Sequence, residues 1–184
     1  RADDNSPCKD LCGAGVVLKL LCALEEDEDF VLEQYADLAA IGTIGDVMPL
    51  TGENRYIVRR GIENIQNNQN LGVERLLRKA GVVPENVTSS SISFTVCPRI
   101  NAAGRMAHAD KAARLLLADD PDTAAMLAEE LEVLNTERRS AEAKVLEEVS
   151  ICIEADPKIL SQRVIVVSGK DWNHGIIGIV GARL

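Results

Sequence analysis

The chain has 184 residues, of which 46% are hydrophobic and 27% charged, and this composition excludes a disordered tail. The longest apolar stretch, Leu11 to Leu24, contains Lys19 and is shorter than the roughly 18 apolar residues of a membrane-spanning helix, so we expect a soluble protein. The net charge of −9, taken as an average over the chain, argues against a nucleic-acid partner, because phosphate binding requires Lys and Arg.

The negative charge is concentrated in two segments. Residues 25–37 carry seven acids and no bases, and residues 119–156 carry twelve acids against three bases. The rest of the chain has ten acids and seventeen bases. A basic surface for phosphate is therefore compatible with the sequence, and the alternative is that these Arg and Lys side chains solvate helix faces.

The five cysteines are odd in number and have no repeated spacing, so they cannot form a complete disulfide framework, and a reducing cytoplasm fits best. Only Cys8 and Cys12 lie close together, and no His follows to complete a zinc set. On a helix these two would share one face as small buried hydrophobic residues.

Helices are expected along most of the first 120 residues. Asn5-Ser6-Pro7 has the capping residue and the proline of a helix start, and Gly81 is typical of the position just after a helix end. Gly13 and Gly15 predict close packing against a neighbouring element, because each costs a helix roughly 1 kcal/mol relative to alanine. The expected helices cover residues 8–24, 31–44, 54–69, 72–80 and 109–117.

A short strand is expected over residues 91–96. There Ile92, Phe94 and Val96 alternate with polar residues, and Pro98 ends the pattern.

One long helix is expected from Pro121 to Ala155. Asp120 caps it, apolar residues recur at spacings of four and three with two charged interruptions, and Pro157 stops it. At 1.5 Å per residue it would be roughly 50 Å long, which few small domains can bury. We interpret it as a connector between two domains, with a long-helix dimer as the alternative.

The last residues predict the beginning of a second domain. A buried strand from Arg163 to Val167 and an apolar helix from Gly175 make the first third of an α/β domain. The expected organisation is therefore 1–120, 121–156 and 157–184, within a longer protein. The strand should expose an unpaired edge through which copies of the chain could associate.

Asp46 is the first candidate for chemistry, because it ends an otherwise apolar helix. A carboxylate among apolar side chains must be paired, hydrogen-bonded or metal-bound, and Mg²⁺ and Mn²⁺ prefer such oxygens. The alternative is a solvated Asp that caps the turn leading into Pro49.

Arg99, Asn101 and Arg105 form a second candidate, which we expect on a loop of small residues. The guanidinium groups could bind phosphate in a bidentate manner, or they could pair with core carboxylates. His174 and Gly175 form a third candidate, at a turn from a strand into the N-terminus of a helix, where backbone N–H groups favour anions.

The chain resembles the RecJ family of single-stranded-DNA-specific 5′ to 3′ exonucleases, in the DHH phosphoesterase superfamily. The similarity runs from about Lys9 to Leu184. It rests on KDLCGAG (9–15), DLAAIGTIGDVMPL (37–50), PRINAAGRM (98–106), LNTER (134–138) and WNHGIIGIV (172–180), in that order.

This resemblance implies a fold of the α/β class, DHH phosphoesterase type, of which this segment is mostly α-helical. It also implies a site for two divalent ions, Mn²⁺ or Mg²⁺. Asp46 matches the family's metal-binding Asp, although Gly45 stands where the family has Ala. The family's earlier Asp and DHH motifs are not in this sequence, and we expect them before Arg1.

The other candidates also match family motifs. Arg99, Asn101 and Arg105 match the arginine motif beside the substrate path, and His174 and Gly175 match the nucleic-acid-facing start of the DHH-associated domain. The implied activity is two-metal hydrolysis of single-stranded DNA in repair and recombination, in the cytoplasm. We expect this segment alone to be inactive.

Two alternatives stay open at this point. One is a DHH-family phosphodiesterase of short oligonucleotides or cyclic dinucleotides, whose Gly-Gly-His type motif this sequence lacks. The other is a non-catalytic helical scaffold that binds a protein through the apolar seam from Leu127 to Cys152.

Overall fold

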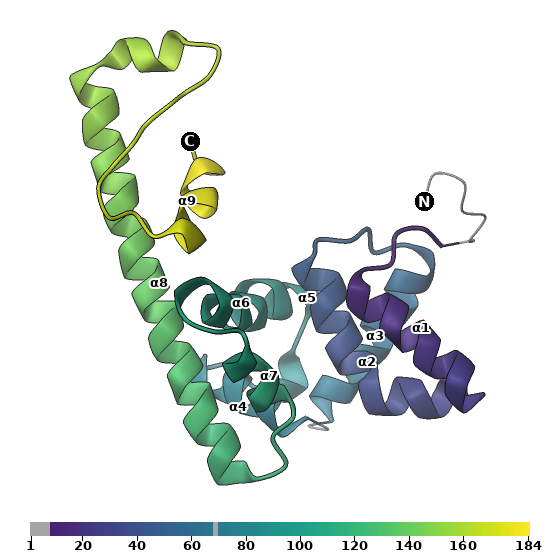
Figure 1. The fold of residues 1–184 in the computed structure, drawn as a ribbon. Helices are drawn as coiled ribbons and strands as arrows, with labels where there is room; N and C mark the ends of the chain where they lie inside the picture. Colours follow the sequence, from purple (N-terminus) through teal and green to yellow (C-terminus); the bar gives the residue numbers. More distant parts are fainter. Residues whose placement is uncertain (1–7, 68–69) are drawn as a thin grey trace.

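A computed structural model describes residues 8–67 and 70–184, and all regular structure in these two ranges is helical (Figure 1). Within the described ranges, no helix is long and apolar enough to cross a membrane. The elements are α1 (Gly13–Glu25), α2 (Glu28–Gly45), α3 (Gly52–Gln66), α4 (Leu71–Lys79), η1 (Pro84–Asn86), α5 (Ser89–Ser91), η2 (Ile92–Val96), α6 (Cys97–Met106), α7 (Asp110–Leu116), α8 (Pro121–Ala155), η3 (Pro157–Ser161) and α9 (His174–Gly181).

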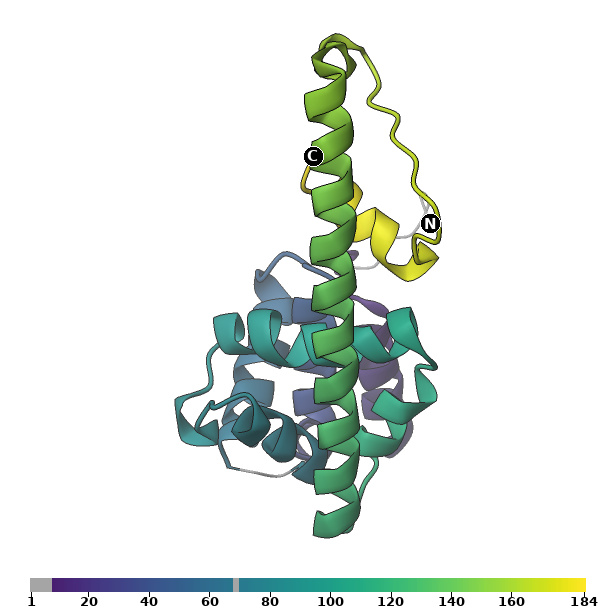
Figure 2. The same cartoon turned by 90° about the vertical axis from the view of Figure 1, so that its left-hand side faces the viewer.

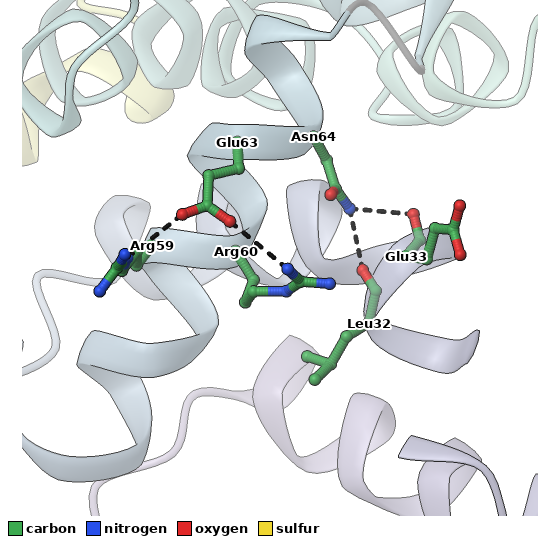
Figure 3. A network of polar contacts seen from close by, with 6 residues as sticks. All are labelled: Leu32, Glu33, Arg59, Arg60, Glu63 and Asn64. Atoms are coloured by element: carbon green, nitrogen blue, oxygen red, sulfur yellow. Dashed lines mark hydrogen bonds and ion pairs between the residues drawn. The ribbon is translucent and has the colours of Figure 1, made fainter. Parts of the chain in front are cut away.

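Helices α1, α2 and α3 pack around a small core at one side of the molecule (Figure 1). The contact between α2 and α3 is so close that a Cβ atom at Gly61 would lie 2.2 Å from the carbonyl oxygen of Ala36. The Asn64 side chain then donates to the carbonyl oxygens of Leu32 and Glu33, at 2.8 and 2.9 Å (Figure 3). Gly61 therefore allows α2 and α3 to pack closely, and the hydrogen bonds of Asn64 stabilise this contact.

The first half of α8 closes a larger core together with α2 to α7. Nineteen buried residues form this core, among them Leu76, Ile92 and Leu115 from the body and Leu127 and Leu131 from α8. Gly72 lets α4 approach α7, because a Cβ atom there would lie 2.1 Å from the carbonyl oxygen of Leu115.

The second half of α8 extends beyond this body and packs mainly against α9 (Figures 1 and 2). Val145 and Val149 meet Ile176 and Val180 in a core of four buried residues. The chain after η3 returns beside α8, and there Trp172 donates from Nε1 to Glu148, at 2.7 Å.

A polar cluster marks the point of α8 between these two cores. Arg138 donates to Asn135 Oδ1 at 3.1 Å and to Glu142 Oε2 at 2.8 Å. Arg183, which follows α9, forms a second ion pair with Glu142 at 2.9 Å. Arg138 and Glu148, the charged interruptions of the predicted seam, thus both have polar partners.

The helix expected from Pro121 to Ala155 is confirmed in its bounds and its Asp120 cap, which accepts from the Thr123 N–H at 2.7 Å. Its apolar seam is covered within the chain, by the body on one half and by α9 on the other. The surface that a scaffold or long-helix dimer would need is therefore already occupied.

The first expected helix begins later than predicted. Asn5-Ser6-Pro7 lies outside the described residues, residues 8–12 are not helical, and the Cys12 sulfur caps α1 by accepting from the Gly15 N–H at 3.3 Å. Cys8 and Cys12 therefore do not share a helix face. Gly13 has open space around it, and a Cβ atom at buried Gly15 would lie 3.2 Å from Leu11, just before α1. The close approach between helices is at Gly42, where a Cβ atom would lie 2.8 Å from that of Ala14.

The strand expected over 91–96 is wrong, because η2 is a π-helical turn inside one helix that runs from α5 through α6. Ile92 and Val96 are buried at the i, i+4 spacing of a helix, whereas Phe94 is 81% exposed. The Cys97 N–H donates to the carbonyl oxygen of Ile92 in this wide turn. The wide turn lies just before Pro98, whose ring would crowd the carbonyl group four residues earlier in a regular helix.

The strand expected from Arg163 to Val167 is also wrong. These residues lack regular structure, and Val164 and Val166 are exposed, because no described segment offers them a ladder of hydrogen bonds. The α/β class is therefore not visible in the described residues, which are helical throughout.

Candidate nucleic-acid and metal site

Asp46 is the C-cap of α2 and is exposed to solvent. Its N–H donates to the carbonyl oxygen of Gly42 at 3.0 Å, so the backbone is held while the carboxylate points away from the core. The expected apolar surroundings are thus wrong for the side chain itself. A carboxylate presented in this way can accept a cation without a large desolvation cost.

The loop after Asp46 is strained and firmly held. Val47 has a φ of 55°, a left-handed conformation that costs a β-branched residue about 1–2 kcal/mol, and it is 85% exposed. Asn54, which is buried, donates to the carbonyl oxygens of Pro49 at 3.1 Å and Asp10 at 2.7 Å. Asn54 carries little signal in the sequence, because an amide in the first turn of a helix is common.

Asp46 lies near the start of α6. Cys97, the first residue of α6, donates its thiol to the carbonyl oxygen of Ile41 at 3.6 Å. Burial raises the pKa of Cys97 to about 11, and the nearby charge of Asp46 adds to this effect. Cys97 is therefore a neutral packing residue at neutral pH.

The arginine motif lies on helix α6, and the prediction of a loop is wrong. Its small residues Ala102 and Ala103 are fully buried where α6 packs on α8. Arg99 points to α8, where Nε pairs with Glu132 at 2.5 Å and Nη1 donates to the carbonyl oxygen of Thr95 at 2.8 Å. Its guanidinium group is mostly engaged within the chain.

Arg105 and Gly175 meet at the junction of α6 and α9. Arg105 Nη1 donates to the carbonyl oxygen of Gly175 at 3.0 Å, and a Cβ atom at Gly175 would lie 2.4 Å from the carbonyl oxygen of Arg105. Asn173 caps α9 by accepting from the Gly175 N–H at 2.8 Å, and exposed His174 is the first residue of that helix.

The structure thus brings Arg105, His174 and Gly175 together and leaves the other candidates apart. Asn101 is exposed one turn before Arg105 on the same face of α6. Asp46 lies near Cys97 at the other end of α6, and Cys97 and Arg105 are about 12 Å apart along the helix axis at 1.5 Å per residue. The candidate residues therefore follow α6 from end to end, except that Arg99 faces α8.

Asp46 fits a divalent cation as one ligand only. Its exposed carboxylate is the hard oxygen donor that Mn²⁺ and Mg²⁺ prefer. In the part of the chain that the structure describes, no three His, Cys, Asp or Glu side chains come close enough together to hold a metal ion. Further ligands would have to come from outside these residues.

Comparison with known proteins gives a consistent result. The single-stranded-DNA-specific exonuclease RecJ of Bacillus subtilis is 38% identical over 178 residues, which are 97% of this chain and 22% of that protein. RecJ of Thermus thermophilus is 39% identical over 173 residues, 94% of this chain and 25% of that protein. The chain belongs to the RecJ family. It spans about a quarter of the length of these two curated relatives.

Solved RecJ structures have the same arrangement of helices. The crystal structure of RecJ from Thermus thermophilus in complex with Mn²⁺ matches 99% of this chain and 27% of that one, at a TM-score of 0.86 and 38% identity. A crystal structure of exonuclease RecJ bound to manganese matches 97% of this chain and 45% of that one, at a TM-score of 0.83 and 38% identity. No protein-family model matches the chain. The resemblance to RecJ that the sequence motifs indicate is confirmed.

Proposed function

We propose that this chain is part of a metal-dependent exonuclease that degrades single-stranded DNA from its 5′ end in repair and recombination. The RecJ relatives and structures support this, and the observation that carries it is the placement of Asp46 and Arg105 at opposite ends of α6. One end presents a carboxylate for a metal ion, and the other presents groups that can bind phosphate.

We assign Mn²⁺ or Mg²⁺ as the cofactor, with Asp46 as one ligand. Two such ions, when bound, activate water and stabilise the in-line transition state of phosphodiester hydrolysis. Asp46 supplies an oxygen ligand from a loop that Asn54 holds in place, which keeps the carboxylate in position for the reaction.

The phosphate-binding groups act through position and charge. Arg105 and the exposed His174 present donors to the backbone of single-stranded DNA, and Asn101 lies on the same face of α6 as Arg105. The Gly175 N–H is held by Asn173, so Gly175 contributes through the positive end of the α9 dipole. Arg99 does not face the DNA in this proposal. It supports the site because its ion pair with Glu132 holds α6 against α8.

We further propose the domain organisation 1–120, 121–156 and 157–184. The first part would belong to an α/β domain of DHH type, α8 would connect the domains, and the last part would begin the nucleic-acid-binding associated domain. The separate cores on the two halves of α8 support this division. Self-association through the exposed residues 163–167 and a cytoplasmic location stay predictions; sedimentation and cell fractionation test them.

The activity is tested in a RecJ-length protein that contains this sequence. We expect Asp46→Ala to lower kcat for release of nucleotides from 5′-labelled single-stranded DNA by orders of magnitude, with DNA binding nearly unchanged. Asp110→Ala removes an exposed Asp on α7 and serves as the control. Undiminished kcat in Asp46→Ala would contradict the assignment.

The binding role of Arg105 has its own test. Arg105→Ala should weaken single-stranded DNA binding and reduce the slope of log K against log salt by roughly 0.7, the value for one phosphate contact. An unchanged slope with a lower melting temperature would identify Arg105 as a structural partner of Gly175 only. The 184-residue chain alone should release no nucleotides, because no three ligand side chains among its described residues come together to hold a metal ion.

A further inference from the structure

Two neighbouring pockets, of which the first adjoins the loop after Asp46, share part of their lining. The first pocket, of about 250 Å³, is lined by residues that include Val47 and Met48, which directly follow Asp46. The second, of about 520 Å³, lies along α3 and is lined by residues that include Arg55 and Arg59. Leu50 and Ser89 line both pockets. We call the two pockets together the α3 groove; their lining residues include none from α6 or α9.

The pocket next to Asp46 has the composition of a base-binding site. Phe94 lines it and is 81% exposed on the wide turn of η2, although an aromatic ring gains most by burial. Ser89, Ser90 and Ser93 line the same pocket, and their hydroxyl groups make no hydrogen bond to any described residue. An exposed ring beside unused hydroxyl groups suits a flat ligand with polar edges, such as a nucleobase.

The pocket along α3 is lined by two arginines and by one carboxylate, Glu63, with which Arg59 and Arg60 already pair. Arg55 is exposed and forms no ion pair with any described residue. Arg59 lies one turn further on the same face, and its contact with Glu63 at 3.2 Å is exposed and therefore weak (Figure 3). Two guanidinium groups one helical turn apart can bind backbone phosphates in place of water.

We propose that the α3 groove binds single-stranded nucleic acid next to the scissile phosphate, with a base stacked on Phe94 and backbone phosphates on Arg55 and Arg59. The proposal rests on the proposed exonuclease function, because Asp46 fixes where the scissile phosphate lies. It adds a second binding surface, separate from the junction of α6 and α9. Val47 lines the first pocket of this groove, so its left-handed backbone helps to shape that pocket.

Photo-cross-linking tests the base site directly. The RecJ-length protein is irradiated in EDTA with an oligothymidine that carries 4-thiothymidine, and the cross-linked peptides are identified by mass spectrometry. We expect cross-links within residues 47–50 or 89–94. Phe94→Leu keeps an apolar side chain but removes the ring, so it should lose the cross-link and raise Kd about fivefold or more.

Salt dependence tests the phosphate site. The double variant Arg55→Ala/Arg59→Ala should lower the slope of log K against log salt by about 1.4, since each contact with a single strand contributes roughly 0.7. Arg114→Ala is the matched control, because Arg114 is an exposed arginine without an ion-pair partner among the described residues, on α7. It should leave both slope and Kd unchanged.

The outcomes separate this proposal from the exonuclease assignment. If the groove variants bind like the parent, and no cross-link falls in the groove, the groove proposal is overturned even where Asp46→Ala abolishes cleavage. If the groove variants weaken binding while Asp46→Ala still cleaves, the groove is a nucleic-acid site and the assignment of Asp46 fails. Protection of Phe94 from oxidation before any oligonucleotide is added would show that protein covers the groove, and would also overturn the proposal.

Discussion

The two halves of α8 carry the same apolar spacing and lie in very different cores. The first half contributes Leu127 and Leu131 to a core of nineteen buried residues, whereas the second half contributes Val145 and Val149 to a core of four. Each of these side chains is nearly or fully buried, so burial of single residues does not distinguish the two halves.

This difference teaches that an amphipathic stripe identifies a buried face but says nothing about how much structure covers it. A side chain in the larger core is tied to α2 to α7 and therefore to the unfolding of the whole body. A side chain in the smaller core is tied mainly to α9, which can detach by local opening. The predictions below test this contrast.

The largest effect is expected at Leu131. Leu131→Ala leaves a cavity in the larger core and should lower the free energy of unfolding by about 2–5 kcal/mol, measured by urea denaturation. Val149→Ala removes fewer atoms and should cost about half as much or less, and hydrogen exchange should rise in α9 rather than in α4. Equal losses with global exchange in both variants would show that the two cores unfold as one.

A pair of glycines on α9 gives the next effect. Gly175→Ala places a Cβ atom 2.4 Å from the Arg105 carbonyl oxygen and should separate α9 from α6, raising exchange of the α9 amides. Gly178 has nothing within 4 Å of the corresponding position, so Gly178→Ala should stabilise the helix by up to about 1 kcal/mol. Similar exchange rates in both variants would contradict the contact between α6 and α9.

The smallest effect concerns Asp37, which is buried in α2. Desolvation raises the pKa of Asp37, against the hydrogen bond from the Leu38 N–H at 2.7 Å. The folded state therefore keeps its proton above the usual pKa near 3.8, and stability falls as pH rises through the window between the two pKa values.

Asp37→Asn should remove this decline, so that the variant melts higher than the parent at pH 7 and like it at pH 3. The gain should appear in the body and leave exchange in α9 unchanged, which sharpens the contrast between the two cores. A variant that melts lower at pH 7 would show that the charged form of Asp37 is stabilised in the fold.

The helices were largely predictable because their ends carry local signals. Asp120, Pro121 and Pro157 bracket α8, and Gly81 follows α4 with a φ of 74°. The strand over 91–96 was mispredicted because alternation and the i, i+4 spacing of Ile92 and Val96 coincide over so short a run. Only tertiary packing decides between them.

The candidate site was predictable as a set of residues but not as an arrangement. The partner of Arg99 is Glu132, 33 residues later, and no local pattern indicates it. The roles of the charged residues in the α8 seam could not be predicted either. Arg138 pairs with Glu142, and Glu148 accepts from Trp172, which lies 24 residues later in the chain. Asp46 was expected among apolar side chains because its sequence neighbours are apolar. The fold places it at the end of α2, where its carboxylate is exposed to solvent.

Helix α8 has no Gly or Pro between Pro121 and Ala155, so we expect it to move as one rigid element. From Asn135 to its end it spans about 30 Å at 1.5 Å per residue. A tilt of about 10° at the polar cluster around Arg138 and Glu142 would displace that end by about 5 Å, simply by leverage over this length. Small adjustments of two ion pairs can thus be amplified into a shift comparable to one helical turn.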